Sequence, residues 1–181
     1  MIGSFIRSLF IAVFVLLSFS VSAEKQVGLS DYPLGAGDLL RITVFGEDDL
    51  SVEVRLSDAG TISYPFLGEL RTRGLTTGVL SESIRSQLAD GYLVNPSVSV
   101  EVVEYRQFFI YGQVEEPGGY PYQPGLTLQR AVALAGGFSE RASSDEFFVA
   151  SEGQEEQSPV KVGINATIKP GDTVTIEESF F

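Results

Sequence analysis

The side chains that could carry chemistry in this chain are carboxylates, because its 181 residues include neither histidine nor cysteine. Glycoside hydrolysis, the reaction that paired carboxylates suggest first, needs two carboxyl groups that face each other about 5–10 Å apart. Neighbouring acids include Glu47-Asp48-Asp49, Glu115-Glu116, Glu155-Glu156 and Glu177-Glu178. Adjacent acids in turns and at strand ends point in different directions, so we interpret these clusters as solvated surface acids.

Other catalytic and metal-binding patterns are missing from the sequence as well. Without cysteine and histidine there is no thiolate nucleophile, no disulfide, and neither the commonest metal ligand nor the commonest general base. No stretch has the ligand spacing of an EF-hand, and neither a Gly-x-Gly-x-x-Gly motif nor a phosphate loop occurs. The sequence therefore predicts no catalytic site, no metal site and no cofactor.

The net charge of −12, from 12 basic and 24 acidic residues, argues against nucleic-acid binding, because phosphates would be repelled. The N-terminus has the features of a signal peptide over residues 1–23, with Arg7, an apolar stretch at 8–19, and small residues before a cleavage site after Ala23. We therefore expect an exported chain. An uncleaved membrane anchor is the alternative, and a lipoprotein is excluded because lipidation needs a cysteine.

The elements that must position any site fall into two units. In the first, period-two alternation predicts strands near 39–45, 51–57, 61–64, 68–71 and 97–102. Leu80, Ile84 and Leu88 form a stripe with helical spacing, which predicts a helix over 77–90 with Thr76 or Thr77 as its N-cap.

The second unit begins near Arg106. It has predicted strands at 108–114, 147–149, 160–162 and 173–176, a turn-rich ribbon at 117–125, and a short helix at 128–135. Thr127 is the expected cap of that helix, and Gly136-Gly137 ends it. A short echo links Gly37-Asp38 to Gly171-Asp172, each a turn that starts a strand. The prediction is an α+β fold of two small β-rich units with one helix each.

Four short blocks, taken in order, resemble one known family. They are YPLGAGDLLRITVFG at 32–46, ISYPFLGEL at 62–70, GYLVNPSV at 91–98, and GQVEEPGGY at 112–120 followed by LTL at 126–128 and AVALAGGF at 131–138. The chain resembles the bacterial outer-membrane polysaccharide export proteins, which join a polysaccharide export domain to an SLBB (soluble-ligand-binding β-grasp) domain. The resemblance implies a polysaccharide export domain at 24–104 and an SLBB β-grasp-like domain at 105–181.

The resemblance implies a function without catalysis. Identical subunits would form a homo-oligomeric ring in the periplasm, associated with the outer membrane, and guide capsule polysaccharide or exopolysaccharide through a wet passage. An inner-membrane polysaccharide copolymerase would be its partner. Family members with a lipid anchor have a cysteine at the cleavage site, and longer ones have a C-terminal membrane helix. This chain shows neither, so we expect a separate outer-membrane pore protein, with Phe180 and Phe181 as candidate docking residues.

Sugars are often bound by aromatic faces, which makes Tyr105, Tyr111, Tyr120 and Tyr122 candidate polymer contacts. Three alternatives stay open. The chain could be a monomeric periplasmic carbohydrate-binding module, which would not form rings. It could be an adaptor that bridges the copolymerase to the outer-membrane pore without a channel of its own. It could also be an exported glycosidase, whose activity would depend on Asp48 or Asp49.

Overall fold

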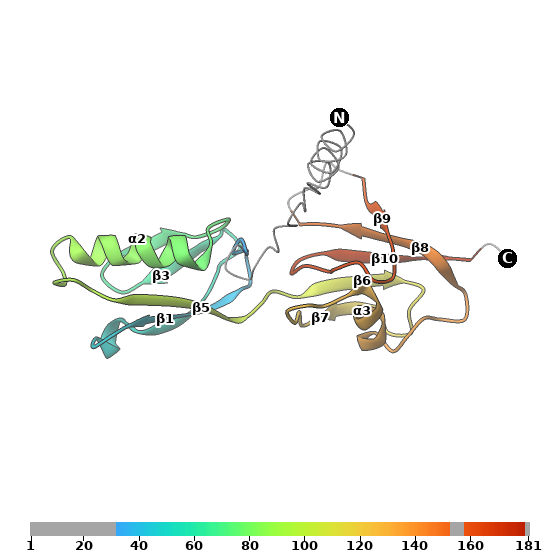
Figure 1. The fold of residues 1–181 in the computed structure, drawn as a ribbon, viewed down its shortest axis with the longest axis horizontal. Coiled ribbons are helices and arrows are strands. Elements are labelled where there is room, and N and C mark those ends of the chain that lie inside the picture. The colour runs from blue at the N-terminus through green and yellow to red at the C-terminus, as the bar shows by residue number, and fades with distance from the viewer. Residues whose placement is uncertain (1–31, 153–157, 180–181) are drawn as a thin grey trace, which may run out of the picture.

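The computed structural model describes residues 32–152 and 158–179 as two domains that lie end to end (Figure 1). Each domain has its own buried apolar cluster. The predicted signal peptide, the pair Glu155-Glu156 and the candidate docking residues Phe180 and Phe181 lie outside the described residues. Within the described ranges, no helix is long and apolar enough to cross a membrane.

The first domain has a three-stranded antiparallel sheet in the order β2-β1-β5, a separate β3–β4 hairpin, and the helix α2. The bounds are β1 Leu39–Val44, η3 Asp48–Leu50, β2 Val52–Arg55, β3 Thr61–Tyr64, β4 Gly68–Arg71, α2 Thr77–Ala89 and β5 Val98–Glu104. Leu40, Ile42 and Val44 alternate inward from β1, and they share one cluster with the predicted α2 stripe. The inward residues of the strand, which repeat every two positions, and those of the helix, which repeat every 3.6, therefore pack in a single core.

The second domain is a five-stranded mixed sheet in the order β7-β6-β10-β8-β9, with the helix α3 packed on one face. The bounds are β6 Phe108–Gly112, β7 Gly118–Tyr120, α3 Leu128–Leu134, β8 Ala142–Ala150, β9 Val160–Val162 and β10 Thr173–Glu178. Strands β6 and β10 run parallel at the centre, and the other neighbours pair antiparallel. The predicted α+β architecture, with one helix in each β-rich unit, is confirmed.

Helix α3 begins differently from the prediction. Thr127 occupies the N-cap position, but its side chain makes no capping hydrogen bond. The first helical N–H groups are bonded by backbone carbonyls instead, because Leu128 donates to Ala166 and Gln129 donates to Ile164. The end is as predicted, since the N–H of Gly137 bonds the carbonyl of Val132, as in a Schellman motif.

This contrast between the two caps gives a testable pair of substitutions. Thr76 accepts a hydrogen bond from the N–H of Val79 at the start of α2. Thr76→Ala should therefore lower the free energy of unfolding by about 1 kcal/mol. Thr127→Ala, which removes no capping bond, is the matched control and should cost less. Urea unfolding followed by circular dichroism measures both, and equal losses would contradict the assignment.

Candidate functional site

The two domains meet around the carboxylate of Asp38, which is fully buried. Its oxygens accept hydrogen bonds from the N–H of Gly35 at 2.8 Å, the hydroxyl of Tyr32 at 2.8 Å and the N–H of Arg106 at 2.8 Å. The Arg106 guanidinium adds an ion pair at 3.2 Å. Both oxygens of the buried carboxylate, which cannot bond water, thus have hydrogen-bond or ion-pair partners within the protein, as a buried carboxylate requires.

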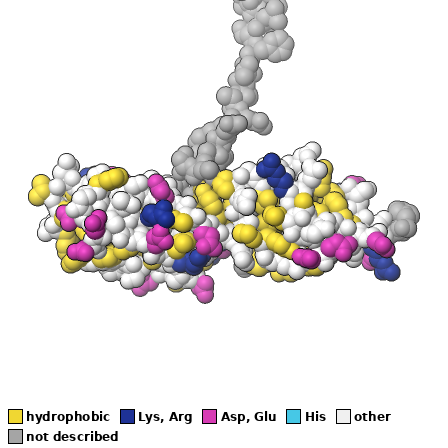
Figure 2. All heavy atoms as spheres, turned by 90° about the horizontal axis from the view of Figure 1, so that it is seen from below, with side chains coloured by type: hydrophobic (Ala, Val, Ile, Leu, Met, Phe, Trp, Pro, Cys, Tyr) yellow, Lys and Arg dark blue, Asp and Glu magenta, His cyan; other side chains and the backbone are white. Residues whose placement is uncertain are grey.

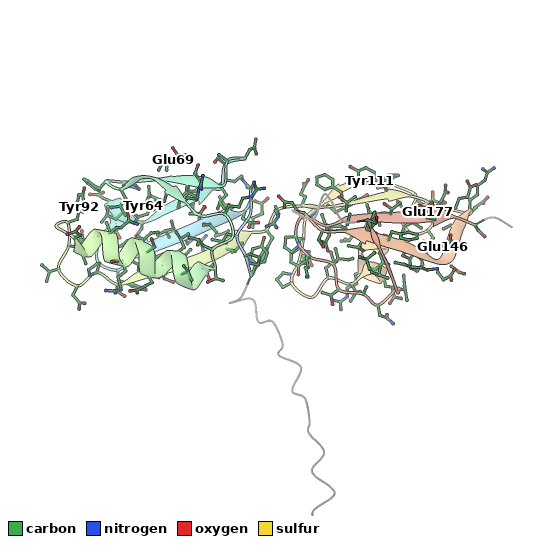
Figure 3. The ribbon with its side chains drawn as sticks, turned by 90° about the horizontal axis from the view of Figure 1, so that it is seen from above. Tyr64, Glu69, Tyr92, Tyr111, Glu146 and Glu177 are labelled. Atoms are coloured by element: carbon green, nitrogen blue, oxygen red, sulfur yellow. The ribbon has the colours of Figure 1, made fainter. Side chains whose placement is uncertain are left out.

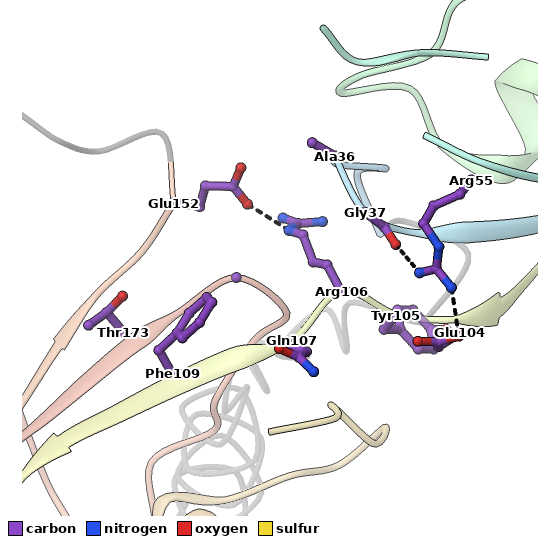
Figure 4. A pocket seen from close by; sticks show the side chains of 11 residues that line it. Ala36, Gly37, Arg55, Glu104, Tyr105, Arg106, Gln107, Phe109, Glu152 and Thr173 are labelled. Atoms are coloured by element: carbon purple, nitrogen blue, oxygen red, sulfur yellow. Dashed lines mark hydrogen bonds and ion pairs between the residues drawn. The ribbon is translucent and has the colours of Figure 1, made fainter. Parts of the chain in front are cut away.

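Arg106 connects this carboxylate to the second domain. Its Nε lies 2.6 Å from Glu152, which follows β8 (Figure 4). Glu152 also pairs with Arg73 of the first domain at 3.2 Å. Two ion pairs therefore cross between the domains, and the Arg106 side chain is only 16% exposed. Figure 2 shows acidic and basic side chains side by side near this junction.

Two glycines leave the space that Arg106 fills. A Cβ on Gly35 would overlap the guanidinium, and a Cβ on Gly171 would lie 2.7 Å from its Nε. Gly171 belongs to the second Gly-Asp turn, in which buried Asp172 accepts from the N–H of Lys169 at 2.8 Å. Asp38 accepts from Gly35 with the same three-residue spacing. The sequence echo thus corresponds to two like turns on either side of Arg106.

Three tyrosines form a chain of edge-to-face contacts beside the network. The ring centroids of Tyr32 and Tyr105 are 5.1 Å apart, and those of Tyr105 and Tyr122 are 5.4 Å apart. Burial raises the pKa of all three hydroxyls, and for Tyr32 the neighbouring Asp38 charge raises the pKa further. These rings stay neutral at physiological pH and fill the junction between the two cores.

The four candidate polymer contacts therefore lie in three different places. Tyr105 and Tyr122 belong to the junction, and Tyr120 packs against the core residue Phe108 with its hydroxyl bonded to the Glu116 carbonyl. Tyr111 stands on the outside of the second domain, 46% exposed (Figure 3). The structure thus separates Tyr111 from the other three tyrosines.

A cleft of about 440 Å³ opens beside Arg106 (Figure 4). Its polar walls include Gln107, Glu152 and Arg55, and Phe109 and Thr173 of the second sheet also line it. Arg55 is held by Glu104 at 2.9 Å and by the carbonyl of Gly37 at 2.6 Å. The cleft thus combines an aromatic side chain with planar polar groups that can donate and accept hydrogen bonds.

The acidic clusters are surface features where the structure describes them. Glu47-Asp48-Asp49 lies exposed around η3, and Glu115-Glu116 and Glu177-Glu178 are also exposed. Among residues 32–152 and 158–179, no three Asp or Glu side chains gather as a metal site would require. The interpretation of these three clusters as solvated acids is confirmed.

Sequence reasoning missed the residues that organise the junction. The sequence marks Arg106 only as the start of the second unit, and it shows Asp38 and Tyr32 only as parts of the first of the four blocks. One usable signal was the repeated Gly-Asp pair, because a buried turn carboxylate needs donors, and a cation from the other unit can supply them. Neither Glu152 nor Arg73 carries such a signal, since both sit in ordinary polar surroundings along the chain.

Comparison with known proteins agrees with this two-domain arrangement. The family described as polysaccharide biosynthesis/export protein matches residues 27–103, and the SLBB domain matches residues 107–161. The exopolysaccharide production protein ExoF of Rhizobium meliloti (strain 1021) is 32% identical over 157 residues, which are 80% of this chain and 37% of ExoF. The polysialic acid transport protein KpsD of Escherichia coli is 23% identical over 169 residues, 87% of this chain and 30% of KpsD.

The chain spans about a third of the length of these curated relatives. Both family matches follow the same order as the two structural domains, and the break between them, at residues 104–106, falls on the junction. The relatives are named for polysaccharide production and transport, and the matching family model is described by polysaccharide biosynthesis and export. The chain belongs to the polysaccharide biosynthesis/export protein family, with an SLBB domain following its polysaccharide export domain.

Proposed function

We propose that this protein is a cell-envelope component of a channel that exports capsule polysaccharide or exopolysaccharide, in which identical subunits form a ring and guide the polymer. The observation that carries the proposal is the junction around Arg106, which fixes two separately folded domains in line. A ring needs its subunits to hold one shape, because a small change in the angle between domains is repeated around the ring. Ion pairs that cross between domains supply that constraint.

The charge of the chain supports guidance rather than tight binding. With a net charge of −12, most of the surface repels an anionic polymer at close range. A passage lined by such a surface would let an acidic polysaccharide move without sticking. No covalent bond is made or broken in this function, which needs only a wet path and walls that do not hold the polymer tightly.

The proposed setting is the periplasm, in association with the outer membrane. An inner-membrane polysaccharide copolymerase would deliver the polymer, and a separate outer-membrane pore protein would pass it on. These partners are part of the proposal and follow from the family. The names of ExoF and KpsD, which refer to exopolysaccharide production and polysialic acid transport, support the handling of polysaccharide, although both relatives are longer than this chain.

The mass of the exported chain in solution tests this function most directly. We expect an assembly much heavier than a single chain, whose mass with all 181 residues is 19.6 kDa, and visible by electron microscopy as a ring with a central opening. Detergent should be tested alongside buffer. A strict monomer at all concentrations, with or without the candidate partners, would contradict the ring and favour a monomeric carbohydrate-binding module. A monomer recruited by the copolymerase would favour the adaptor.

A further inference from the structure

Two aromatic rings stand exposed on strand β6. Phe109 and Tyr111 are 39% and 46% exposed, and their ring planes are parallel within 3° with centroids 6.4 Å apart. They alternate with Phe108 and Ile110, which are fully buried against α3. The strand therefore presents one face to the core and two parallel rings to the outside.

Hydroxyl groups lie beside these rings. On the parallel neighbour β10, Thr173 pairs with Phe109 and Thr175 pairs with Tyr111. Paired residues of adjacent strands point to the same face of a sheet, so rings and hydroxyls alternate across the outer face. Half-buried Phe148, the β8 partner of Thr175, extends the same row. This mixture differs from the purely apolar surface that would pack against another core.

The outer face continues into the junction cleft. Phe109 and Thr173 line the cleft as well as the sheet, and Gln107 and Glu152 stand near them (Figure 4). Carboxamide and carboxylate groups can bond neighbouring hydroxyls of one sugar, while an aromatic ring packs on its C–H face. The cleft volume of about 440 Å³ lies within the range of known small-molecule pockets.

The local charge selects the kind of sugar. The charged residues that line the cleft are Arg55, Arg106, Glu104 and Glu152, so two positive charges balance two negative ones. The chain as a whole carries −12. A carboxylated sugar would gain no net attraction in the cleft, and it would be repelled by the surrounding surface. An uncharged sugar is not repelled by the negative surface, and it can still stack on the aromatic rings and form hydrogen bonds through its hydroxyls.

From these observations we infer that the cleft and the outer face of β6 form one glycan-binding track, which takes a neutral, hydroxyl-rich stretch of polysaccharide. Phe109 and Tyr111 are its stacking surfaces, and Gln107, Glu152 and Thr173 bind sugar hydroxyls. The inference rests on the export function proposed above and assigns to it a weak contact for the passing polymer. The chemistry of the track selects uncharged pyranose units, whatever their linkage.

Nuclear magnetic resonance of the ¹⁵N-labelled exported chain tests the track, with cellohexaose, maltohexaose and mannohexaose as neutral probes and hexagalacturonic acid as the charged one. We expect at least one neutral hexasaccharide to shift the amide signals of residues 107–111 and 173–175. Hexagalacturonic acid should bind at least about tenfold more weakly. Tyr111→Ala should weaken the neutral probe about tenfold, the effect of losing one buried aromatic contact.

Two further variants keep this test interpretable. The Phe109 ring packs over Gly119, so closely that a Cβ built on Gly119 would lie 2.9 Å from it. Phe109→Leu removes the aromatic face but keeps an apolar side chain over Gly119. This variant should therefore fold and bind the neutral probe weakly. Tyr92→Ala is the matched control, because Tyr92 and Phe66 form another exposed aromatic pair, 5.9 Å apart, at the far end of the first domain (Figure 3). It should bind like wild type.

The results that overturn the track differ from those that overturn the export function. If no neutral probe shifts these signals, or if Tyr92→Ala weakens binding as much as Tyr111→Ala, the track is wrong. If the same signals shift with protein concentration alone, the face is an interface between copies, and the track is again wrong. The export function has a separate test, which is the amount of secreted polysaccharide after deletion of the gene. An unchanged amount contradicts the proposed function itself.

Discussion

Replacing Asp38 with alanine should lower the free energy of unfolding by about 3–5 kcal/mol, the cost of leaving the partner of a buried ion pair uncompensated. The Arg106 guanidinium, only 16% exposed, would lose the carboxylate 3.2 Å away. The N–H groups of Gly35 and Arg106 and the hydroxyl of Tyr32 would lose their acceptor at the same time. An unpaired buried donor costs about 1–3 kcal/mol, so the loss comes from several groups at once.

The same substitution should also uncouple the domains. The described contacts that cross the junction include the Arg106–Asp38 pair, the Arg73–Glu152 pair and the tyrosine chain. Asp38 bonds a member of two of them, Arg106 and Tyr32. Urea unfolding followed by tyrosine fluorescence should therefore change from one transition to two. Limited proteolysis should then cleave near residues 105–107, which link β5 to β6.

Arg41→Ala is the matched control for this prediction. Arg41 pairs with Glu53 at 2.6 Å, but both side chains are 49% exposed. Exposed pairs contribute about 0–1 kcal/mol because water screens the charges. If Asp38→Ala costs no more than Arg41→Ala, the junction is not the structural centre that its geometry indicates. A large loss with a single transition would show that the domains unfold together without this carboxylate.

The parts of the fold that sequence reasoning predicted depend on short-range patterns. Leu80, Ile84 and Leu88 define α2 because residues four apart share one helix face. Leu40 and Ile42 define β1 because alternate residues share one sheet face. These patterns need no knowledge of the partner strand, so the type and approximate bounds of the elements could be read directly from the chain.

The junction could not be predicted in this way, since it depends on residues far apart in the sequence. Asp38 and Arg106 are 68 positions apart, and Arg73 and Glu152 are 79 apart. Their contact exists only because β5 leads directly into β6 and places the second domain against the first Gly-Asp turn. The sequence alone gives no register that would bring these groups together.

The aromatic candidates show the same limit on a smaller scale. Tyr111 and Tyr120 both lie on strands, and residue type alone does not distinguish them. The pairing of β6 with β7 decides the difference, because Tyr120 lies opposite the buried Phe108 and packs on its ring. Tyr111 has the opposite parity on β6 and faces outward. Phe109, which the sequence analysis did not select, shares that outward parity.

Replacing Gly112 with alanine should have the second large effect, a loss of about 2–5 kcal/mol confined to the second domain. Gly112 ends β6 with φ +84°, a conformation that costs a residue with a Cβ about 1–2 kcal/mol. Its Cβ would also overlap the carbonyl oxygen of Ile176 on β10. That carbonyl accepts a hydrogen bond from the N–H of Gln113 at 2.9 Å. Backbone atoms cannot rotate away, so overpacking adds about 1–3 kcal/mol.

Gly46→Ala separates the two causes of this loss. Gly46 has φ +86°, nearly the same as Gly112, but a Cβ there meets no atom within 4 Å. Alanine at Gly46 should therefore cost only the conformational penalty of about 1–2 kcal/mol. Hydrogen exchange should locate the damage, with faster exchange of β6 and β10 amides in Gly112→Ala and unchanged exchange in α2. Equal losses for the two variants would mean that the parallel β6–β10 pair can shift to admit a methyl group, and that this central pairing holds the SLBB domain less rigidly than its contacts indicate.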